Sequence, residues 1–152
     1  MSLRVYRVCR AVHARLDGAG ARLVGGRWNS PGTALVYMAE SVSLAVLENL
    51  VHMSREDFPT GYVVVSAVIP DGLRVMGEEE LVARHGERSM RELGDAWVRR
   101  MESAVLRVRS RVVGEEHNFL LNPAHSEFAR IVVEGARAFE FDTRLFGGGA
   151  RR

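Results

Sequence analysis

Residues 25–53 constrain the fold more than any other stretch, because they combine a glycine turn, a short strand and an apolar helix. The stretch reads GGRWNSPGTALVYMAESVSLAVLENLVHM. Arg27 follows the glycine pair, and a single acid, Glu48, lies in the middle of the predicted helix. Either charge is costly to bury without a partner. We therefore expect Arg27 and Glu48 either to form a structural ion pair or to serve a chemical site.

The helix in this stretch is predicted to begin after Ser41, a favourable N-cap, and to end near residue 53. Two apolar rows cover most of its surface, formed by Leu44, Leu47 and Val51 and by Val46, Leu50 and Met53. The remaining stripe contains Ser41, Ala45, Glu48 and His52. Because this polar stripe is narrow, we expect it to face a cleft.

The rest of the chain predicts an α+β fold, in which a mixed, curved sheet packs against a few helices. Strands and helices do not alternate regularly enough for a doubly wound sheet. Residues 10–26 read as a long loop, residues 73–90 as polar and weakly helical, and residues 91–103 as a helix with Leu93, Trp97 and Met101 aligned. Strands are expected at residues 3–9, 34–39, 62–69, 104–109, 128–134 and 138–141.

Length and composition fit one folded domain over residues 1–146, followed by a disordered tail at residues 147–152. No stretch approaches the ~20 apolar residues that span a bilayer, and the first ten residues do not resemble a signal peptide. The single cysteine, Cys9, excludes an internal disulfide and fits a reducing cytoplasm. We therefore expect a cytoplasmic protein with no membrane partner.

All 21 basic residues are arginine, although the net charge is only +2. Coding bias explains the missing lysine, but the forked guanidinium still suits phosphate and carboxylate groups. The densest basic run, residues 99–111, is interrupted by Glu102 and by apolar residues. Direct binding to nucleic acid would require a concentrated basic stripe, so we do not expect it.

Common cofactor and metal motifs are absent from the sequence. Neither of the usual glycine-rich nucleotide loops occurs, and no HExxH or GxSxG is present. The five histidines do not have the spacing of metal ligands. We therefore expect no metal and no bound cofactor.

Several runs in fixed order resemble the RES domain family over residues 3–146. They are GGRWN, ALVYMAES and LAVLENLVH in the first half, and GDAWV, AVLRVRS, EEHNFLLNPAHSEF and FEFDTRL in the second. The resemblance implies an ADP-ribosyltransferase-like fold. It also implies a toxin that cleaves NAD⁺, partnered by an Xre-like antitoxin with a toxin-binding domain, and it is compatible with a homo-oligomer.

The family is named for an arginine, a glutamate and a serine, which correspond here to Arg27, Glu48 and Ser110. The resemblance adds Arg7 from the first strand and Tyr37 from the second. Asn118 is a further candidate substrate-binding residue at the same rim. This chain departs from the family at Arg109, where proline is usual. Ser126, in NPAHSEF, competes with Ser110 for the serine position.

The resemblance implies that these residues cleave the bond between nicotinamide and ribose. The two arginines would bind the pyrophosphate, and Tyr37 would stack on the substrate. Glu48 would either stabilise an oxocarbenium-like transition state or orient the ribose hydroxyls and the nucleophile. Ser110 would form one hydrogen bond, to a phosphate or to the amide of the substrate. Water as the nucleophile would make the protein a glycohydrolase, inorganic phosphate a phosphorylase, and a protein side chain an ADP-ribosyltransferase. The alternative is a non-catalytic binding module with a structural Arg27–Glu48 pair.

Overall fold

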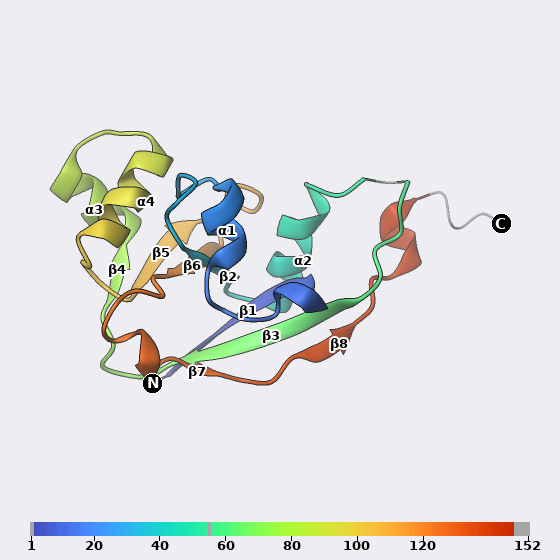
Figure 1. The fold of residues 1–152 in the computed structure, drawn as a ribbon. Coiled ribbons are helices and arrows are strands. Elements are labelled where there is room, and N and C mark those ends of the chain that lie inside the picture. Colours follow the sequence, from blue (N-terminus) through green and yellow to red (C-terminus); the bar gives the residue numbers. More distant parts are fainter. Residues whose placement is uncertain (1, 55, 148–152) are drawn as a thin grey trace.

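The computed structural model describes residues 2–54 and 56–147, and it has the predicted α+β architecture. One curved sheet has the strand order β4-β5-β6-β2-β1-β3-β7, with β8 also paired to β3 (Figure 1). Its strands are β1 (Leu3–Arg10), β2 (Val36–Ala39), β3 (Tyr62–Ile69), β4 (Val75–Gly77), β5 (Val105–Arg109), β6 (His117–Leu121), β7 (Val132–Val133) and β8 (Arg137–Phe139). The α-helices are α1 (Ala19–Val24), α2 (Val42–Leu50), α3 (Glu78–His85) and α4 (Met90–Arg99).

The sheet consists of two halves that meet between β1 and β2. Strand β1 pairs with β3 along its whole length, from Leu3 opposite Ile69 to Arg10 opposite Tyr62. Its register with β2 consists of a single pair, Tyr6 opposite Ala39. All pairings are antiparallel except that of β4 with β5. This narrow junction brings the two halves together beside the N-terminal end of α2.

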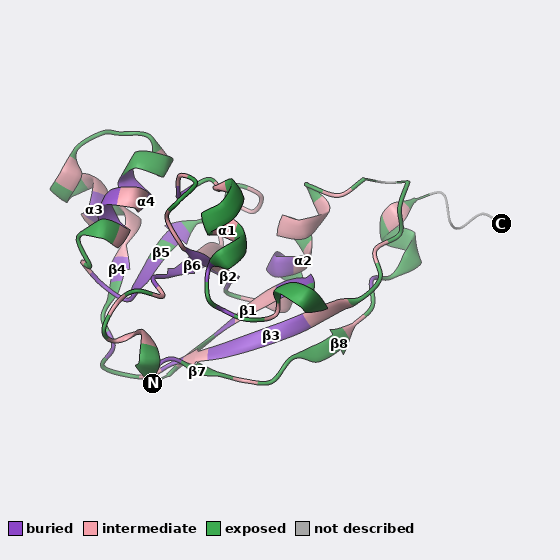
Figure 2. Cartoon of the chain, in the orientation of Figure 1, coloured by how far each residue is buried: buried purple, intermediate pink, exposed green. Residues whose placement is uncertain are grey.

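Side chains on opposite faces of the sheet belong to different apolar clusters. Val36 and Met38 of β2 pack in one cluster, whereas Leu35 and Tyr37 pack in another with the buried residues of α3 and α4. This alternation of neighbouring side chains between two faces is that of a β-strand. A third cluster joins Leu44 of α2 to β1 and β3. Figure 2 shows the burial concentrated along the central strands, with α1 and β8 on the exposed exterior.

Where the local sequence signal is strong, the predicted elements are present. The strand predicted at residues 62–69 is β3, and α2 begins after Ser41, whose Oγ accepts a hydrogen bond from Leu44 N at 3.1 Å. Helix α2 is shorter than expected and ends at Leu50. Glu78, Glu79 and Glu80 form the first turn of α3, as the sequence indicates.

Four expectations are wrong in detail. Residues 10–26 contain a 3₁₀ turn (Ala11–His13) and α1, and residues 73–90 contain strand β4. Residues 128–134 form a 3₁₀ turn (Phe128–Arg130) and a two-residue strand. Helix α4 ends at Arg99, because Met101 has a φ of 53°, outside the helical region; Met101 is exposed and does not align with Trp97.

The last element of the described chain is the 3₁₀ turn Thr143–Phe146. Of the tail predicted at residues 147–152, all but Gly147 lie outside the described residues. No helix in the described part of the chain is long and apolar enough to cross a membrane.

Candidate active site

A pocket of about 490 Å³ opens where the two halves of the sheet meet α2 and the loop at residues 25–28. Five of the six predicted site residues line it: Arg7, Arg27, Tyr37, Glu48 and Asn118. The sixth, Ser110, is buried behind Glu48. Residues that are far apart in the sequence are therefore gathered around one cavity.

Ser110 holds the carboxylate of Glu48. Its Oγ donates a hydrogen bond to Glu48 Oε2 at 2.7 Å. The Ser110 Oγ also accepts hydrogen bonds from Val112 N at 3.1 Å and Val113 N at 3.0 Å. Because the backbone donors occupy the hydroxyl's lone pairs, its proton is directed at Glu48. Ser126 is exposed in the turn after β6 and does not line the pocket, so Ser110 is the serine that contacts the glutamate.

The polar stripe of α2 faces the pocket, as its narrowness predicted. Ala45, Glu48 and His52 all line the cavity. Asn49, beside Glu48, donates to Val8 O and to Ala45 O, both at 2.8 Å. This side chain ties α2 to β1 and fixes the height of Glu48 above the sheet.

The loop that carries Arg27 requires both of its glycines. Gly25 has a φ of 79°, which favours glycine. A Cβ at Gly26 would lie 2.6 Å from Tyr37 Oη, too close for any side chain. Gly26 N donates to Asn29 O at 2.9 Å and closes the loop, so that the exposed Arg27 stands at its tip and lines the pocket.

Tyr37 and Asn29 hold this loop from below. The Tyr37 hydroxyl donates to Asn29 Oδ1 at 2.6 Å and accepts from Trp28 N at 3.0 Å. Burial raises the pKa of Tyr37 to about 12, against the opposing effect of the Trp28 N–H. Because its hydroxyl is used by the loop, Tyr37 offers a ligand chiefly its ring.

Sequence reasoning missed Asn29, which is completely buried. Its Nδ2 donates to Ala21 O and Thr33 O, both at 2.8 Å, so it folds residues 21–33 around itself. A buried asparagine with its hydrogen bonds satisfied is a strong structural constraint. Its place at the end of GGRWN was the only local signal for this role.

The arginines of the pocket differ in their partners. In the described residues, no carboxylate lies within salt-bridge distance of Arg7 or Arg27, whereas Arg111 Nη2 is 2.9 Å from Glu78 Oε2. The Arg27–Glu48 pair of the binding-module alternative is therefore not formed in this part of the chain. The hydrogen-bond partner of the Glu48 carboxylate is instead Ser110.

Arg7 and Arg109 also line the pocket wall. Arg7 interacts with the buried Cys9 thiol, whose pKa is raised by burial and lowered in part by that guanidinium. Arg109 N donates to Glu78 Oε1 at 2.9 Å, a bond that the proline usual in the family could not make. Glu78 thus fixes the turn at residues 109–111 and, through it, the backbone at Ser110.

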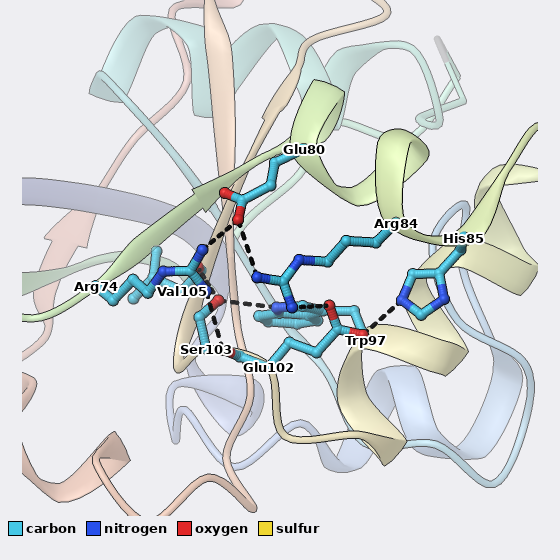
Figure 3. A network of polar contacts seen from close by, with 8 residues as sticks. All are labelled: Arg74, Glu80, Arg84, His85, Trp97, Glu102, Ser103 and Val105. Atoms are coloured by element: carbon cyan, nitrogen blue, oxygen red, sulfur yellow. Dashed lines mark hydrogen bonds and ion pairs between the residues drawn. The ribbon is translucent and has the colours of Figure 1, made fainter.

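A second polar cluster lies around α3, the C-terminal part of α4 and the start of β5, and we call it the distal cluster (Figure 3). Here the side chain of Glu102 is only 7% exposed. Its Oε2 lies 2.5 Å from His85 Nε2, and its Oε1 lies 3.6 Å from Arg84 Nη1. Arg84 also pairs with Glu80, as does Arg74. Next to them, Trp97 Nε1 donates to Ser103 Oγ at 2.9 Å, and Ser103 donates to Val105 O at 2.7 Å.

No group of three or more His, Cys, Asp or Glu side chains within residues 2–54 and 56–147 is arranged to hold a metal ion. The functional groups that line the pocket include a single carboxylate, several guanidinium groups, three tyrosine rings and an imidazole, supplied by Glu48, Arg7, Arg27, Arg109, Arg111, Tyr6, Tyr37, Tyr62 and His52. Such a set suits a substrate that carries phosphate groups next to a centre that becomes positively charged.

Comparison with known proteins gives consistent results. The chain matches the RES domain over residues 4–144. It is 35% identical over 140 residues to the Prs ADP-ribosylating toxin of Sphingobium sp. (strain YBL2), a match covering 86% of each chain. It is 34% identical over 149 residues to the protein called Toxin Res of Photorhabdus laumondii, covering 93% of this chain and 96% of the relative.

A solved structure shares the fold. A chain of the M. tuberculosis MbcT–MbcA toxin–antitoxin complex superposes with a TM-score of 0.70 at 16% identity, covering 96% of this chain and 87% of that chain. Identity this low supports a common fold and nothing more. The α+β architecture expected from the sequence is thereby confirmed.

Proposed function

This chain belongs to the RES domain family, and on that premise we propose that it is the toxin of a bacterial toxin–antitoxin pair that degrades NAD⁺. The relatives called Toxin Res support the first part of the proposal. The second part rests on one observation. Glu48 lines a pocket in which Arg7 and Arg27 have no carboxylate partner among the described residues. Unmatched guanidinium groups beside one oriented carboxylate fit a substrate with a pyrophosphate and an incipient cation.

The proposed reaction breaks the bond between C1′ of the nicotinamide ribose and the pyridinium nitrogen. The bonding electron pair moves to the nitrogen and neutralises it, so nicotinamide leaves without a general acid. Positive charge then spreads over C1′ and the ribose ring oxygen, as in glycoside cleavage. A carboxylate beside this oxocarbenium-like centre lowers the energy of the transition state. Glu48 is the carboxylate available, and Ser110 orients it.

The remaining residues bind the substrate in this proposal. Arg7 and Arg27 hold the pyrophosphate with forked hydrogen bonds. The Tyr37 ring contacts the nicotinamide or its ribose, and Asn118 contributes a polar group to the same wall. Attack by water on C1′ gives ADP-ribose and releases one proton, which Glu48 can accept. Attack by inorganic phosphate instead gives ADP-ribose 1″-phosphate.

Transfer of ADP-ribose to a protein is the second candidate function. The Sphingobium relative, called an ADP-ribosylating toxin, is the observation that favours it. The bond that breaks is the same, and only the nucleophile at C1′ differs. The two candidates are separated by incubating the pure protein with NAD⁺ alone, with phosphate, and with a cell extract.

The decisive measurement is the release of free nicotinamide by folded protein purified without a partner. Release with water or phosphate alone supports the NAD⁺-degrading function. Release that requires extract and labels a protein supports the transferase. No release under any of these conditions rules out both and leaves a non-catalytic binding module.

We further propose that an Xre-like antitoxin with its own toxin-binding domain inhibits this chain. The fold is shared with a chain solved in a toxin–antitoxin complex, and that observation motivates the proposal. Co-expression with the product of the adjacent reading frame should suppress nicotinamide release and yield a complex on size-exclusion chromatography. The same chromatography of the chain alone tests for a homo-oligomer.

A further inference from the structure

Helix α4 presents one face to the loop that carries Arg27. Arg91, Gly94 and Asp95 occupy positions i, i+3 and i+4 and therefore share a side of the helix. Gly94 and Asp95 open the run GDAWV, which resembles the RES family but has no role in the chemistry above. This face contacts residues 26–30, immediately below the pocket.

Two sets of hydrogen bonds bracket the tip of the loop. On one side, Arg91 Nε and Nη2 donate to Gly26 O at 3.2 and 3.1 Å. On the other side, Asp95 Oδ1 accepts from Ser30 N at 2.8 Å, and Asp95 Oδ2 accepts from Ser30 Oγ at 2.5 Å. The residues between these anchors, from Arg27 to Asn29, are thereby fixed at both ends to one rigid helix.

Gly94 makes the close approach of helix and loop possible. A Cβ at this position would lie 1.7 Å from Trp28 O, so any side chain would force the loop away from α4. Glycine is disfavoured inside helices, and the close packing against Trp28 is a physical reason for its presence. The carbonyl of Trp28 therefore rests directly on the helix backbone, one residue after Arg27.

We propose that Asp95 is a positioning residue that sets the place of Arg27 in the pocket. The Arg27 side chain is exposed and has no hydrogen bond or salt bridge in the described part of the chain. Its position consequently depends on the backbone that carries it, and Asp95 holds that backbone from the C-terminal side. The inference rests on the proposed function, in which Arg27 binds the pyrophosphate of NAD⁺.

This role has a kinetic signature. Because pyrophosphate is bound alike in the ground and transition states, a displaced Arg27 should raise KM more than it lowers kcat. Asparagine should also be able to replace Asp95 in this role. The amide of asparagine can accept from Ser30 N through its oxygen and donate to Ser30 Oγ, since a hydroxyl also accepts. A residue acting through its charge would not be replaced by asparagine.

The test compares Asp95→Ala, Asp95→Asn and a control, Asp57→Asn, which makes the isosteric change at an exposed residue between α2 and β3. We expect Asp95→Ala to raise the KM for NAD⁺ about tenfold with kcat changed less than about threefold. Asp95→Asn should stay within about threefold of wild type in both parameters, and the control should match wild type.

A second readout does not depend on activity. The chain has two tryptophans, Trp28 in the loop and Trp97 in the core. In 5-fluorotryptophan protein, a Trp97→Phe variant assigns the Trp28 fluorine resonance. Asp95→Ala should shift or broaden that resonance, and Asp95→Asn should leave it close to its wild-type position. Thermal unfolding of each variant checks that it is folded.

The outcomes are distinct. An unchanged KM with an unmoved Trp28 resonance in Asp95→Ala overturns the inference, as does an Asp95→Asn variant that is as impaired as the alanine variant. A wild type that releases no nicotinamide defeats the proposed function, and the fluorine resonance then still decides whether Asp95 holds the loop. Should Asp95→Ala fail to fold, Ser30→Ala removes one of the two bonds and should raise KM about threefold.

Discussion

Two regions of this molecule contain the same residue types in opposite electrostatic situations. The pocket has Arg27, Glu48 and Ser110, and the distal cluster has Arg84, Glu102 and Ser103 (Figure 3). In the distal cluster the guanidinium lies close to two carboxylates, Glu80 and Glu102. In the pocket the guanidinium has no carboxylate partner within the described residues, and the carboxylate is held by a neutral hydroxyl.

This difference separates a structural network from a candidate site. Charges paired with each other compensate one another inside the fold and have little left to offer a ligand. A charged side chain that is hydrogen-bonded only to neutral groups can still interact strongly with a charged substrate. Residue type alone therefore does not identify the site, since both regions contain arginine, glutamate and serine. Matched substitutions in the two regions test this interpretation.

The largest contrast is expected between the two glutamates. Glu48→Gln should reduce kcat for nicotinamide release by about 100-fold or more, because it removes the anion beside the developing cation. Its thermal stability should be close to that of wild type. Glu102→Gln should retain activity and lose about 1–3 kcal/mol of unfolding free energy, because the largely buried His85 and the more exposed Arg84 lose the carboxylate that they contact. A Glu48→Gln variant that unfolds would indicate a structural role for Glu48.

The two arginines should give the next largest contrast. Arg27→Ala should raise the KM for NAD⁺ about 10- to 100-fold, because a charged, forked contact to phosphate is lost. Arg84→Ala should leave KM within about twofold and lower the unfolding temperature by a few degrees. Steady-state kinetics and a thermal scan of both proteins are sufficient. Equal kinetic effects in the two variants would argue against Arg27 as a pyrophosphate ligand.

A smaller contrast is expected between the serines. Ser110→Ala removes the bond that orients Glu48 and should lower kcat about tenfold, which corresponds to about 1.4 kcal/mol. Ser103→Ala leaves Trp97 Nε1 without its buried acceptor and should destabilise the fold by about 1–3 kcal/mol without changing kcat. A Ser126→Ala variant serves as the exposed control. If it lost activity while Ser110→Ala did not, the serine assignment would be reversed.

An effect confined to high pH is expected for Tyr37, the β2 residue whose hydroxyl holds the loop that carries Arg27. Its pKa is raised from 10.0 to about 12, so the folded state holds this proton more tightly than the unfolded state. The resulting stability is fully present below pH 10 and is lost as the pH rises to about 12. The loss amounts to at most about 2–3 kcal/mol.

Tyrosinate absorbance measures this titration directly. The difference between wild type and Tyr37→Phe should show one tyrosine ionising near pH 12 in folded protein. Ionisation of Tyr37 near its ordinary pKa would mean that the hydroxyl is not buried between Trp28 N and Asn29. The loop that presents the exposed Arg27 would then not be held rigidly by Tyr37.

The local sequence predicted much of the scaffold for physical reasons. The nearly continuous apolar run of β3, the alternation in β2 and the N-cap of α2 arise from neighbouring residues, so a window of several residues contains them. Weak local signals explain the errors: β4 has three residues and β7 two, and both exist because a neighbouring strand pairs with them. The end of α4 likewise carries no glycine or proline that would mark it.

The sequence by itself determined that Arg27 stands on a glycine turn and that Glu48 lies on a narrow polar stripe of α2. Tertiary structure alone decided that Ser110, 62 residues away from Glu48, orients its carboxylate, and that Asp95, 65 residues from Ser30, anchors the loop. It also decided that Arg27 and Glu48 do not pair within the described chain. Such contacts depend on how strands and helices pack, and no periodicity within a segment specifies which distant hydroxyl or carboxylate will meet it.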